Sequence, residues 1–424
     1  MALHPSVAGL DTVRIVGTGL LGTSIGLKLR DLGVRVLLSD PSPMALALAQ
    51  DVGAGEPDPG GVPVSLVVVG APPDVTASVV AAELARHPEA TVTDVASVKS
   101  GIWAAVLASG ADITRYVGGH PMAGRERSGP VAARADLFLG RPWVVCPADS
   151  TIASTRTDPV RVELVRRLAA AVGASPVVMP AVEHDEAVSL ISHVPQIAAS
   201  LVAARLVKAS DPAVGLAGQG LRDVTRVADS DPALWAQILT ANAGPVGRVL
   251  REIRSDLDGL ITALAALEAA NRAEASRGSK AGGSGALGRA NGSGVDAEPG
   301  VGAEPGMDGG QGQDRGLDPV RQAIGSRAAV ARVIADGRTG RERIPGKHGE
   351  PVTRYAVVTA LLPDAAGQLA RLFNDIGEAG INVEEFGLEH APGQKVGLAG
   401  VSVLPAVREA LEKALIERGW HVVA

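Results

Sequence analysis

The sequence has one cysteine, Cys146, and few aromatic residues, which make up 2% of its 424 residues. A single thiol excludes an internal disulfide framework and a metal site with several thiolate ligands. With so few aromatic side chains, the hydrophobic cores must be built from valine, leucine, isoleucine and alanine. We expect Cys146 itself, in the strand-like stretch 143–147, to be a small buried apolar side chain.

An excess of positive charge, a secretion signal and long apolar runs are also lacking. The formal net charge is −6, so the chain has no general attraction to nucleic acid or to an anionic membrane surface. Residues 1–11 show no charged start followed by an apolar run, so no signal peptide is visible. No run of about 18 apolar residues suggests a membrane-spanning helix. These absences predict a soluble cytoplasmic protein that binds neither nucleic acid nor membrane.

Short apolar runs alternate with helix-like segments over the first third of the chain. The runs that predict buried strands are residues 13–16, 34–39, 65–70, 91–94, 115–118 and 143–146. Strands that alternate with helices require crossover connections, which give a parallel sheet covered on both faces. We therefore expect an α/β domain over residues 1–155.

The character of the sequence changes from about residue 158. Long helix candidates at 160–172, 183–209, 231–238 and 246–275 predict an all-helical domain over residues 156–275. Residues 276–318 are rich in Gly, Ser, Ala, Asp and Pro, and cannot bury enough apolar surface to fold, so they predict a disordered linker. A connector over 319–352 follows, with a short helix at 319–336 and a basic stretch at 338–347 that we interpret as solvated or interdomain.

The last segment, residues 353–424, again has the pattern of a folded domain. Strands are expected at 355–361, 382–388, 396–403 and 420–423, and helices at 365–379 and 406–418. The first helix is closed by Gly380 at its C-terminal end. The order β-α-β-β-α-β predicts a small α+β domain of the ferredoxin-like type.

A glycine-rich motif follows the first predicted strand directly and opens a helix: Gly17-Thr-Gly19-Leu20-Leu21-Gly22. The first glycine permits a tight turn, the second lets the backbone approach a pyrophosphate, and the third lets helix and strand pack closely. The free N–H groups of the first helical turn would bind that anion. The motif alone is weak evidence among 52 glycines, but the strand before it and the helix after it predict a Rossmann domain.

Asp40 ends the second predicted strand, about 20 residues beyond the glycine motif. At this position an acidic side chain accepts hydrogen bonds from the adenosine ribose hydroxyls, which favours NAD over NADP. The alternative is that Asp40 only begins the turn Asp40-Pro41-Ser42. Arg35 is not at the usual position for binding a 2′-phosphate.

Polar residues gather in three further segments that a purely structural role explains poorly. They are TDVASVK at 93–99, GGHPMAGRERSG at 118–129 and RDVTR at 222–226. The first two come just after predicted strands, at the carboxyl ends where parallel sheets place ligands. The third lies within the helical region.

Together these motifs resemble the prephenate/arogenate dehydrogenase family. The family pattern G-x-G-x-x-G, S-V-K, G-G-H-P-x-A-G-x-E, S-H-x-P and R-D-x-T-R-[IV]-A-x-S-D-P occurs here in that order, over about residues 12–270. The resemblance implies NAD-dependent oxidative decarboxylation of prephenate or arogenate. Hydride leaves C4 of the ring for the nicotinamide, CO2 leaves C1, and the ring becomes aromatic.

The resemblance assigns roles to residues of the three segments. His120 would accept the proton of the C4 hydroxyl, because a neutral imidazole can take it. Ser97 would bridge the nicotinamide and that hydroxyl with Lys99 in support, and Arg226 would bind a substrate carboxylate through two parallel hydrogen bonds. The structural alternatives are a loop histidine bonded to backbone, a helix N-cap at Ser97 and a surface ion pair of Arg226 with Asp223 or Asp229.

Several polar residues bear on the choice of substrate. Glu126 could order the mouth of the site, and Arg125 and Gln196 could contact the substrate side chain. Relatives often have S-H-L-P-H where this chain has Gln196 in place of the second histidine. Prephenate carries a keto acid side chain and arogenate an amino acid, so the choice stays open. We expect no metal site, since His184 and His193 are nine residues apart and hydride transfer needs no metal.

The C-terminal segment resembles an ACT domain, a small amino-acid-sensing module, through LPDAAGQLA at 362–370 and AGINV at 379–383. Ala366 replaces the usual proline before the loop glycine. The resemblance implies pairing of such units, a homodimer and feedback by tyrosine, with a purely structural dimerisation module as the alternative.

Two other functions fit parts of the sequence. A 3-hydroxyacid or 6-phosphogluconate type of dehydrogenase shares the layout but uses a lysine on the first interdomain helix, where this chain offers only Lys208. A catalytically silent amino-acid sensor could be built from the same parts. The presence of Ser97, His120 and Arg226 argues against that sensor.

Overall fold

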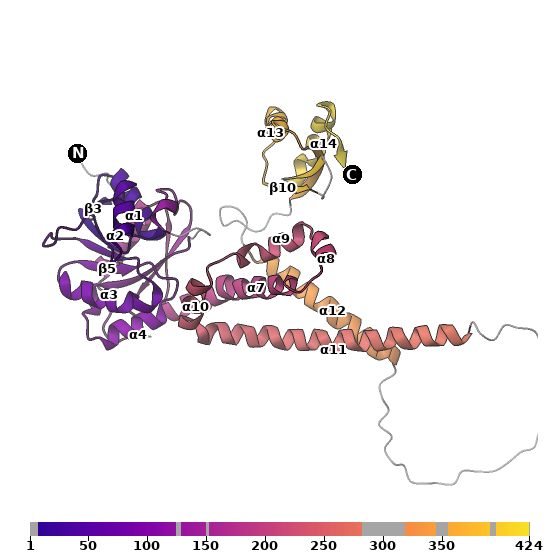
Figure 1. Ribbon diagram of the computed structural model, residues 1–424, viewed down its shortest axis with the longest axis horizontal. Coiled ribbons are helices and arrows are strands. Elements are labelled where there is room, and N and C mark those ends of the chain that lie inside the picture. The colour runs from indigo at the N-terminus through magenta and orange to yellow at the C-terminus, as the bar shows by residue number, and fades with distance from the viewer. Residues whose placement is uncertain are drawn as a thin grey trace, which may run out of the picture. The chain divides into compact units, whose positions relative to one another are not determined.

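The computed structural model describes residues 7–123, 129–149, 152–281, 319–344, 355–390 and 396–423. The chain divides into two compact units, Met1–Arg251 and Glu252–Ala424 (Figure 1). The first unit holds the glycine-rich motif and the polar segments expected to form a site. The second holds the small C-terminal domain.

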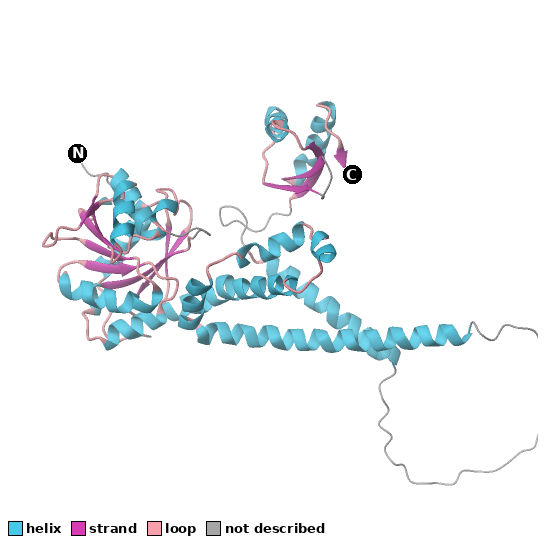
Figure 2. Ribbon diagram, in the orientation of Figure 1, coloured by secondary structure: helices cyan, strands magenta, loops and turns pink. Residues whose placement is uncertain are grey.

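The first unit is built on an eight-stranded sheet with helices on both faces (Figure 2). Its strands are β1 Thr12–Val16, β2 Arg35–Ser39, β3 Glu56–Pro57, β4 Leu66–Val69, β5 Thr91–Asp94, β6 Tyr116–Pro121, β7 Pro142–Pro147 and β8 Ser175–Val178. Their spatial order is β3-β2-β1-β4-β5-β6-β7-β8. Neighbours pair in parallel except β6 and β7, which are antiparallel. The order changes direction between β1 and β4, where doubly wound sheets bind ligands, and the predicted Rossmann-like α/β fold is confirmed.

Strand β4 shows how both faces of the sheet are buried. Leu66 and Val68 contact one apolar cluster, which includes residues of helices α1 and α5. Val67 and Val69 contact the opposite cluster, with residues of α3 and α4. A strand covered on both faces has a continuous apolar sequence, which is why this strand was predictable. The helices of this layer are α1 Leu20–Asp31, α2 Pro43–Asp51, α3 Pro73–Arg86, α4 Ser100–Ala108 and α5 Pro159–Ala171.

The sheet extends beyond the boundary expected at residue 155. Helix α5 buries Val165 and Leu168 in the first apolar cluster. Strand β8 then pairs in parallel with β7. The expectation that α5 opens the all-helical domain is therefore wrong. Strand β8 was not predicted, because it is a short edge strand. Three of its four residues are exposed, so it has no buried apolar run.

Helices follow the sheet, as expected for the second region. They are α6 Ala181–Val188, α7 Val194–Leu206, α8 Asp211–Gly215, α9 Gln219–Thr225, α10 Pro232–Ala241 and α11 Ala243–Ala281. A π-helical turn, Ser189–His193, joins α6 to α7. Among the described residues one helix, Ala181–Leu206, is long and apolar enough by length and composition to cross a membrane, which differs from the sequence expectation. One such helix is weak evidence, because core helices of soluble proteins also pass this test.

The second unit contains most of α11, helix α12 and a small antiparallel sheet. Helix α11 continues to Ala281, into the linker expected from residue 276, and residues 282–318 lie outside the described part of the chain. Helix α12, Pro319–Glu342, runs six residues past its expected end at 336, through the start of the basic stretch. The small domain has strands β9 Ala356–Pro363, β10 Glu385–His390, β11 Val396–Val403 and β12 Val422–Val423, with helices α13 Gln368–Glu378 and α14 Arg408–Glu417.

The strand order of the small domain is β10-β11-β9-β12, with every pair antiparallel. Buried residues of β9 and β11, such as Val358 and Val401, pack against Leu372 of α13 and Leu411 of α14. This confirms the expected α+β arrangement with two helices against one small sheet.

The central strand of the first unit gives a test of the fold. Ile15 in β1 is fully buried. We expect Ile15→Ala to lower the free energy of unfolding of this unit by about 2–5 kcal/mol, because the lost side chain leaves a cavity. Chemical denaturation followed by circular dichroism would measure the change. Val131→Ala is the control, since Val131 is 75% exposed and its loss should cost less than about 0.5 kcal/mol. Equal effects would contradict the placement of β1 in the core.

Candidate active site

The glycine-rich loop has the geometry of a pyrophosphate cradle. Gly17 has φ +100°, and a Cβ atom there would lie 2.5 Å from the carbonyl oxygen of Gly70. A Cβ on Gly22 would lie 2.0 Å from the carbonyl oxygen of Gly17, so the start of helix α1 can pack closely on β1 only with glycine there. Gly19, by contrast, has no atom within 4 Å of its Cβ position, so space is left beside the loop.

Helix α1 begins at Leu20, followed by Leu21. Its N-cap is Gly19, so no side chain caps the helix. Its first N–H groups and its positive dipole end are therefore available to an anion. This arrangement fits the pyrophosphate of NAD.

Asp40 lies directly beside the glycine-rich loop. Its Oδ2 accepts hydrogen bonds from the backbone N–H of Thr18 at 2.6 Å and from Thr18 Oγ1 at 2.9 Å. Its Oδ1 accepts from the backbone N–H of Ser42 at 2.8 Å, so Asp40 also begins a turn. The two interpretations of Asp40 are compatible, because the turn holds the carboxylate at the position where a ribose binds in this fold. Arg35 is turned to Glu56, with Nε 2.7 Å from Oε1.

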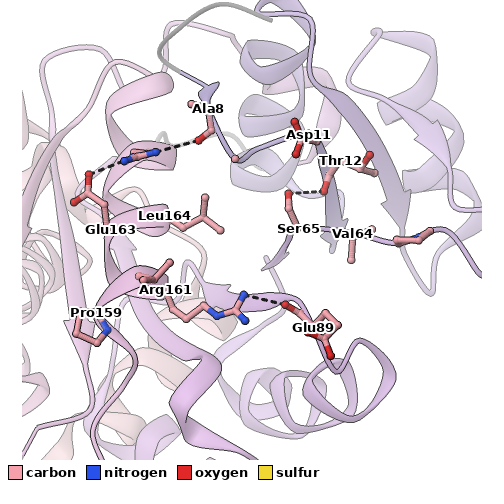
Figure 3. Close-up of a pocket in the computed structure, with 14 residues that line it drawn as sticks. Ala8, Asp11, Thr12, Val64, Ser65, Glu89, Pro159, Arg161, Glu163 and Leu164 are labelled. Carbon is pink, nitrogen blue, oxygen red and sulfur yellow. Dashed lines mark hydrogen bonds and ion pairs between the residues drawn. The ribbon is translucent and has the colours of Figure 1, made fainter.

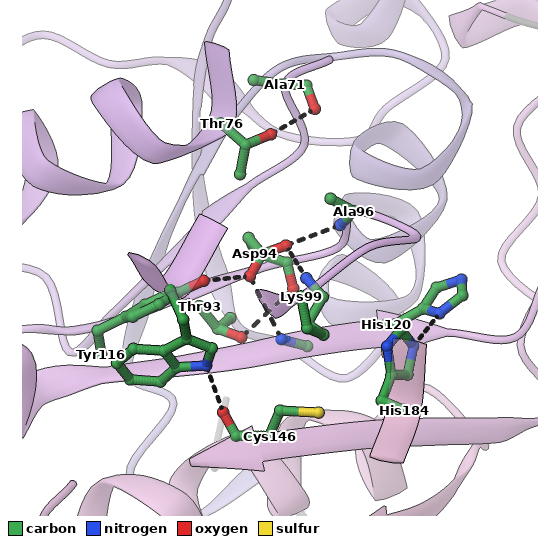
Figure 4. Close-up of polar contacts among 12 residues, drawn as sticks. Ala71, Thr76, Thr93, Asp94, Ala96, Lys99, Tyr116, His120, Cys146 and His184 are labelled. Atoms are coloured by element: carbon green, nitrogen blue, oxygen red, sulfur yellow. Dashed lines mark hydrogen bonds and ion pairs between the residues drawn. The ribbon is translucent and has the colours of Figure 1, made fainter. Parts of the chain in front are cut away.

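A buried polar network lies at the carboxyl end of β5 (Figure 4). Asp94 Oδ1 accepts hydrogen bonds from Lys99 Nζ and, at 2.8 Å, from the backbone N–H of Ala96. Its Oδ2 accepts from the hydroxyl of Tyr116 at 2.7 Å. Burial, followed by the charge of Asp94, raises the pKa of Tyr116 well above its ordinary value, so the phenol keeps its proton and donates.

Lys99 lies in the loop that follows β5. Its side chain is fully buried and forms an ion pair with Asp94. Lys99 thereby holds the loop after β5 and places a positive charge near His120, and its support of the nicotinamide stays a prediction. Ser97 lies half-buried in the same loop. Helix α4 starts at Ser100 with Lys99 at the N-cap, so Ser97 is not the N-cap of that helix.

His120 lies at the carboxyl end of β6 and connects to two residues of α6. Its Nδ1 is 2.8 Å from Nε2 of His184, and Nδ1 of His184 is 2.8 Å from Oδ1 of Asp185. The two imidazole rings meet edge to face with centroids 5.0 Å apart (Figure 4). His120 is half-buried, whereas His184 and Asp185 are buried. Neither partner was predicted as part of the site, because the motifs indicated His184 only as a possible metal ligand.

The carboxylate of Asp185 is held by two backbone donors as well. The N–H groups of Lys99 and Ser100 lie 2.8 Å from Oδ1 and Oδ2, respectively. Burial would raise the pKa of Asp185, but hydrogen bonds from His184, Ser100 and Lys99 lower it overall. Asp185 is therefore a charged carboxylate at neutral pH.

Asn242 links His193 to Asp185. Its Nδ2 donates to the backbone carbonyl of Asp185 at 2.8 Å and to Nδ1 of His193 at 3.1 Å. The ring of His193 meets Trp235 edge to face, with centroids 6.0 Å apart. Burial lowers the pKa of His193 to about 4, so it is neutral at neutral pH. In the described part of the chain, no group of three or more potential ligands could hold a metal ion.

His120 is poised to accept a proton. Burial is the main cause that lowers its pKa well below 6.5, and the neighbouring His184, Lys99 and His193 lower it further. The imidazole is therefore neutral at neutral pH, as a proton acceptor must be. His120 is neutral in this way without any bound ligand.

The structure does not bring all expected site residues together. Arg226 lies on an exposed turn after α9. Gln196 is buried on α7, with Nε2 3.5 Å from Ser200 Oγ. Their contacts with substrate stay predictions. Arg125 and Glu126 lie outside the described residues.

A cavity of about 840 Å³ lies at the opposite, amino-terminal edge of the sheet (Figure 3). Thr12, the first residue of β1, lines it, whereas the glycine-rich loop follows the last residue of that strand. Its Arg161 donates to the carbonyl oxygen of Glu89 at 2.9 Å, and its Arg167 pairs with Glu163 at 3.3 Å. This cavity is separate from the cofactor loop and from His120.

The fold and the site define an NAD-dependent dehydrogenase with a Rossmann domain followed by helices. Comparison with known families matches residues 25–178 to the nucleotide-binding domain of prephenate dehydrogenase and residues 180–275 to its dimerization domain. The first match ends at the last residue of β8, in agreement with the extended sheet.

Relatives agree with this class. The chain is 36% identical to the probable prephenate dehydrogenase NovF of Streptomyces niveus, over 97% of this chain and 99% of that protein. It is 33% identical to prephenate dehydrogenase of Bacillus subtilis, over 55% of this chain and 64% of the relative. The protein belongs to the prephenate dehydrogenase family.

Two solved structures show the same fold. The prephenate dehydrogenase of A. aeolicus, in complex with hydroxyphenyl propionate and NAD+, matches with a TM-score of 0.55 and 26% identity, over 64% of this chain and 96% of that one. A putative prephenate dehydrogenase of Corynebacterium glutamicum matches with a TM-score of 0.56 and 31% identity, over 60% and 82%. The protein is an NAD-dependent oxidoreductase, as the sequence predicted.

The open space at Gly19 gives a test of the cofactor loop. We expect Gly19→Ala to fold normally but to raise the Kd for NAD at least about tenfold, or about 1.4 kcal/mol, because the methyl group would obstruct the approach of a pyrophosphate. Isothermal titration calorimetry would measure it. Gly101→Ala is the matched control, since its Cβ position also has no atom within 4 Å but lies in α4. Unchanged NAD binding in Gly19→Ala would contradict this placement of the cofactor.

Proposed function

We propose that the protein converts prephenate to 4-hydroxyphenylpyruvate by NAD-dependent oxidative decarboxylation, a step of tyrosine biosynthesis. The observation that carries the proposal is the position of neutral His120. It lies at the end of β6, which runs parallel to β5, at the same edge of the sheet as the glycine-rich loop. A proton acceptor and a cofactor loop at one edge are what a hydroxyl oxidation requires.

The reaction needs few groups from the protein. NAD, when bound by the glycine-rich loop and Asp40, supplies the acceptor for the hydride that leaves C4 of the substrate. The Nε2 atom of His120 takes the hydroxyl proton as the C4–O bond gains double-bond character. When CO2 leaves C1, its bonding electron pair enters the ring, and the ring oxygen recovers a proton from His120. Aromatisation drives the step, so the protein chiefly orients the substrate and holds one proton.

The remaining substrate contacts are proposed from the family pattern. Arg226 would bind a carboxylate of the substrate through its guanidinium, which matches a carboxylate with two parallel hydrogen bonds. Ser97, in the loop between β5 and α4, would donate to the reacting hydroxyl and contact the nicotinamide. Gln196, Arg125 and Glu126 would surround the substrate side chain and the mouth of the site.

Arogenate is the alternative substrate. A solved arogenate dehydrogenase from Synechocystis matches this chain with a TM-score of 0.51 and 26% identity, over 60% of this chain and 92% of that one. Gln196 stands where the family often has histidine, and an amide can face either a keto acid or an amino acid side chain. We favour prephenate because the relative that matches nearly the full chain carries that name.

Assembly as a homodimer is part of the proposal. The matched dimerization domain covers residues 180–275. Helix α11 carries an exposed apolar stripe within this range, formed by Ile253, Leu257, Ile261 and Leu264, which are each 45–55% exposed. The spacing of three and four residues places the stripe on one helix face, which a second copy could cover. Burial of apolar surface between copies would also suit a cytoplasmic enzyme.

The small C-terminal domain is proposed to be an ACT-like regulatory module. Its β-α-β-β-α-β order and its antiparallel sheet support this interpretation. Tyrosine is the proposed effector, since it is the product of the pathway that prephenate dehydrogenation serves. A catalytically silent sensor would keep this domain and lose turnover.

The decisive test is NAD reduction by the full-length protein with prephenate and with arogenate, followed at 340 nm. We expect turnover with at least one substrate and a higher kcat/KM for prephenate. A higher kcat/KM for arogenate would reverse the assigned preference, and no turnover with either would favour the silent sensor. Addition of tyrosine in the same assay is expected to inhibit.

Substitution of the proton acceptor tests the mechanism. We expect His120→Asn to lower kcat by about 10²- to 10⁴-fold with little change in NAD affinity, because only proton transfer is lost. In the wild type, burial lowers the pKa of His120, so kcat/KM should stay constant down to pH 6.5 and fall only below it, as the imidazole becomes protonated. Retained activity in His120→Asn, or an acid limb above pH 6.5, would show that another group is the acceptor.

A further inference from the structure

The hydrogen bonds from Asp185 to His120 start at a carboxylate. A charged carboxylate can only accept, so Nδ1 of His184 must donate to Asp185. When His184 carries a single ring proton, its lone pair is on Nε2, and it accepts a hydrogen bond from Nδ1 of His120, 2.8 Å away. Neutral His120 therefore carries its proton on Nδ1 and its lone pair on Nε2.

The bond between His184 and Asp185 cannot reverse, because Asp185 is a carboxylate whose two oxygens both accept from other donors. Backbone N–H groups of Lys99 and Ser100 each donate at 2.8 Å. The carboxylate also lies at the start of α4, where the helix dipole favours negative charge. Asp185 has a side-chain exposure of 5% and His184 of 1%, so water cannot compete for these bonds.

We propose that Asp185 and His184 are positioning residues that fix His120 in the Nδ1–H tautomer, with Nε2 free to accept the substrate hydroxyl proton. The tautomer is a property of the protein without ligands. Only its role in accepting the substrate proton rests on the proposed function. A neutral histidine side chain in water prefers the Nε2–H form, which would present a donor in place of an acceptor. The chain of bonds thus selects the form that the chemistry needs.

The same hydrogen bonds stabilise the positive charge that develops on His120 in the reaction. The O–H bond of the substrate breaks, an N–H bond forms at Nε2, and Nδ1 keeps its proton. The resulting imidazolium faces Lys99, His184 and His193, none of which offers negative charge. Lys99 is paired with Asp94. Asp185, reached through His184, is then the anion that offsets the new charge without a second proton transfer.

Two variants of His184 separate the tautomer from simple packing. In His184→Gln the amide oxygen can still accept from Nδ1 of His120, although the link to Asp185 is lost. His184→Leu has similar volume to fill the space but no acceptor. His87→Gln is the matched control, since His87 is a half-buried histidine of the same unit that caps α3.

Nitrogen NMR of histidine-labelled full-length protein without ligands reads the tautomer directly. We expect both His120 and His184 to show the Nδ1–H form in the wild type, with His120→Asn used to assign the resonance. His184→Gln should keep Nδ1–H at His120, and His184→Leu should shift it to Nε2–H or a mixture. His87→Gln should change neither signal. The Nε2–H form at His120 in the wild type would overturn the proposal.

The pH profile of kcat/KM provides the kinetic measurement. We expect His184→Leu to lower kcat about 10²-fold and to move the acid limb to lower pH, since the imidazolium of His120 loses its acceptor. The KM for substrate and the Kd for NAD should change little. His184→Gln should stay within about tenfold of the wild type. A loss of folded protein alone would lower the amplitude and leave the acid limb in place.

The two proposals fail in different ways. If the wild type shows Nδ1–H at His120 but no turnover with prephenate or arogenate, the proposed function is wrong and the hydrogen-bond chain stands. If turnover is present and folded His184→Leu keeps the wild-type kcat and acid limb, the positioning role is wrong and the enzyme activity stands. If His184→Leu does not fold, the tautomer of His120 in the wild type and in His184→Gln still tests the positioning role.

Discussion

A buried carboxylate that must find its hydrogen-bond donors organises the centre of the first unit. An unpaired charge inside a protein is costly, so Asp185 is stable there only with partners on both oxygens. Those partners come from the loop before α4 and from its neighbour His184. The requirement thereby joins α6, the first of the helices after the sheet, to the carboxyl edge of the sheet, and it brings His120 into the same set of bonds.

A second buried carboxylate, Asp94, acts on the same loop from the other side. It accepts from the backbone N–H of Ala96 and from the ammonium of Lys99, while Asp185 accepts from the backbone N–H of Lys99. The loop that carries Ser97 is therefore fastened before and after that residue. A loop held at both ends loses little further entropy when a ligand binds, which favours a preformed site.

Local patterns made much of the fold predictable. The strands of the Rossmann sheet have continuous apolar runs, and Gly17, Gly19 and Gly22 have a recognisable spacing directly after the first strand. Strand β8 was missed because an edge strand needs no apolar face. Because β8 belongs to the sheet, the first domain ends later than the expected residue 155.

The candidate site was predictable only in part. His120 was found through its motif, but its contact with His184 joins residues 64 positions apart, and Asp185 reaches Ser100 across 85. Such contacts depend on how α6 packs, which no periodicity shows. The ion pair of the buried Lys99 with Asp94 was not predicted either, for the same reason.

The π-helical turn Ser189–His193 adds one residue to a helical turn, and this determines the relation of two histidines. In a regular α-helix, with about 100° per residue, His184 and His193 would lie on opposite sides of the helix. The extra residue rotates His193 back by about 100°, toward the side from which Asn242 reaches both it and the backbone of Asp185. A change in chain length by one residue within this turn would therefore alter the site as much as a substitution, although every side chain of the cluster would still be present.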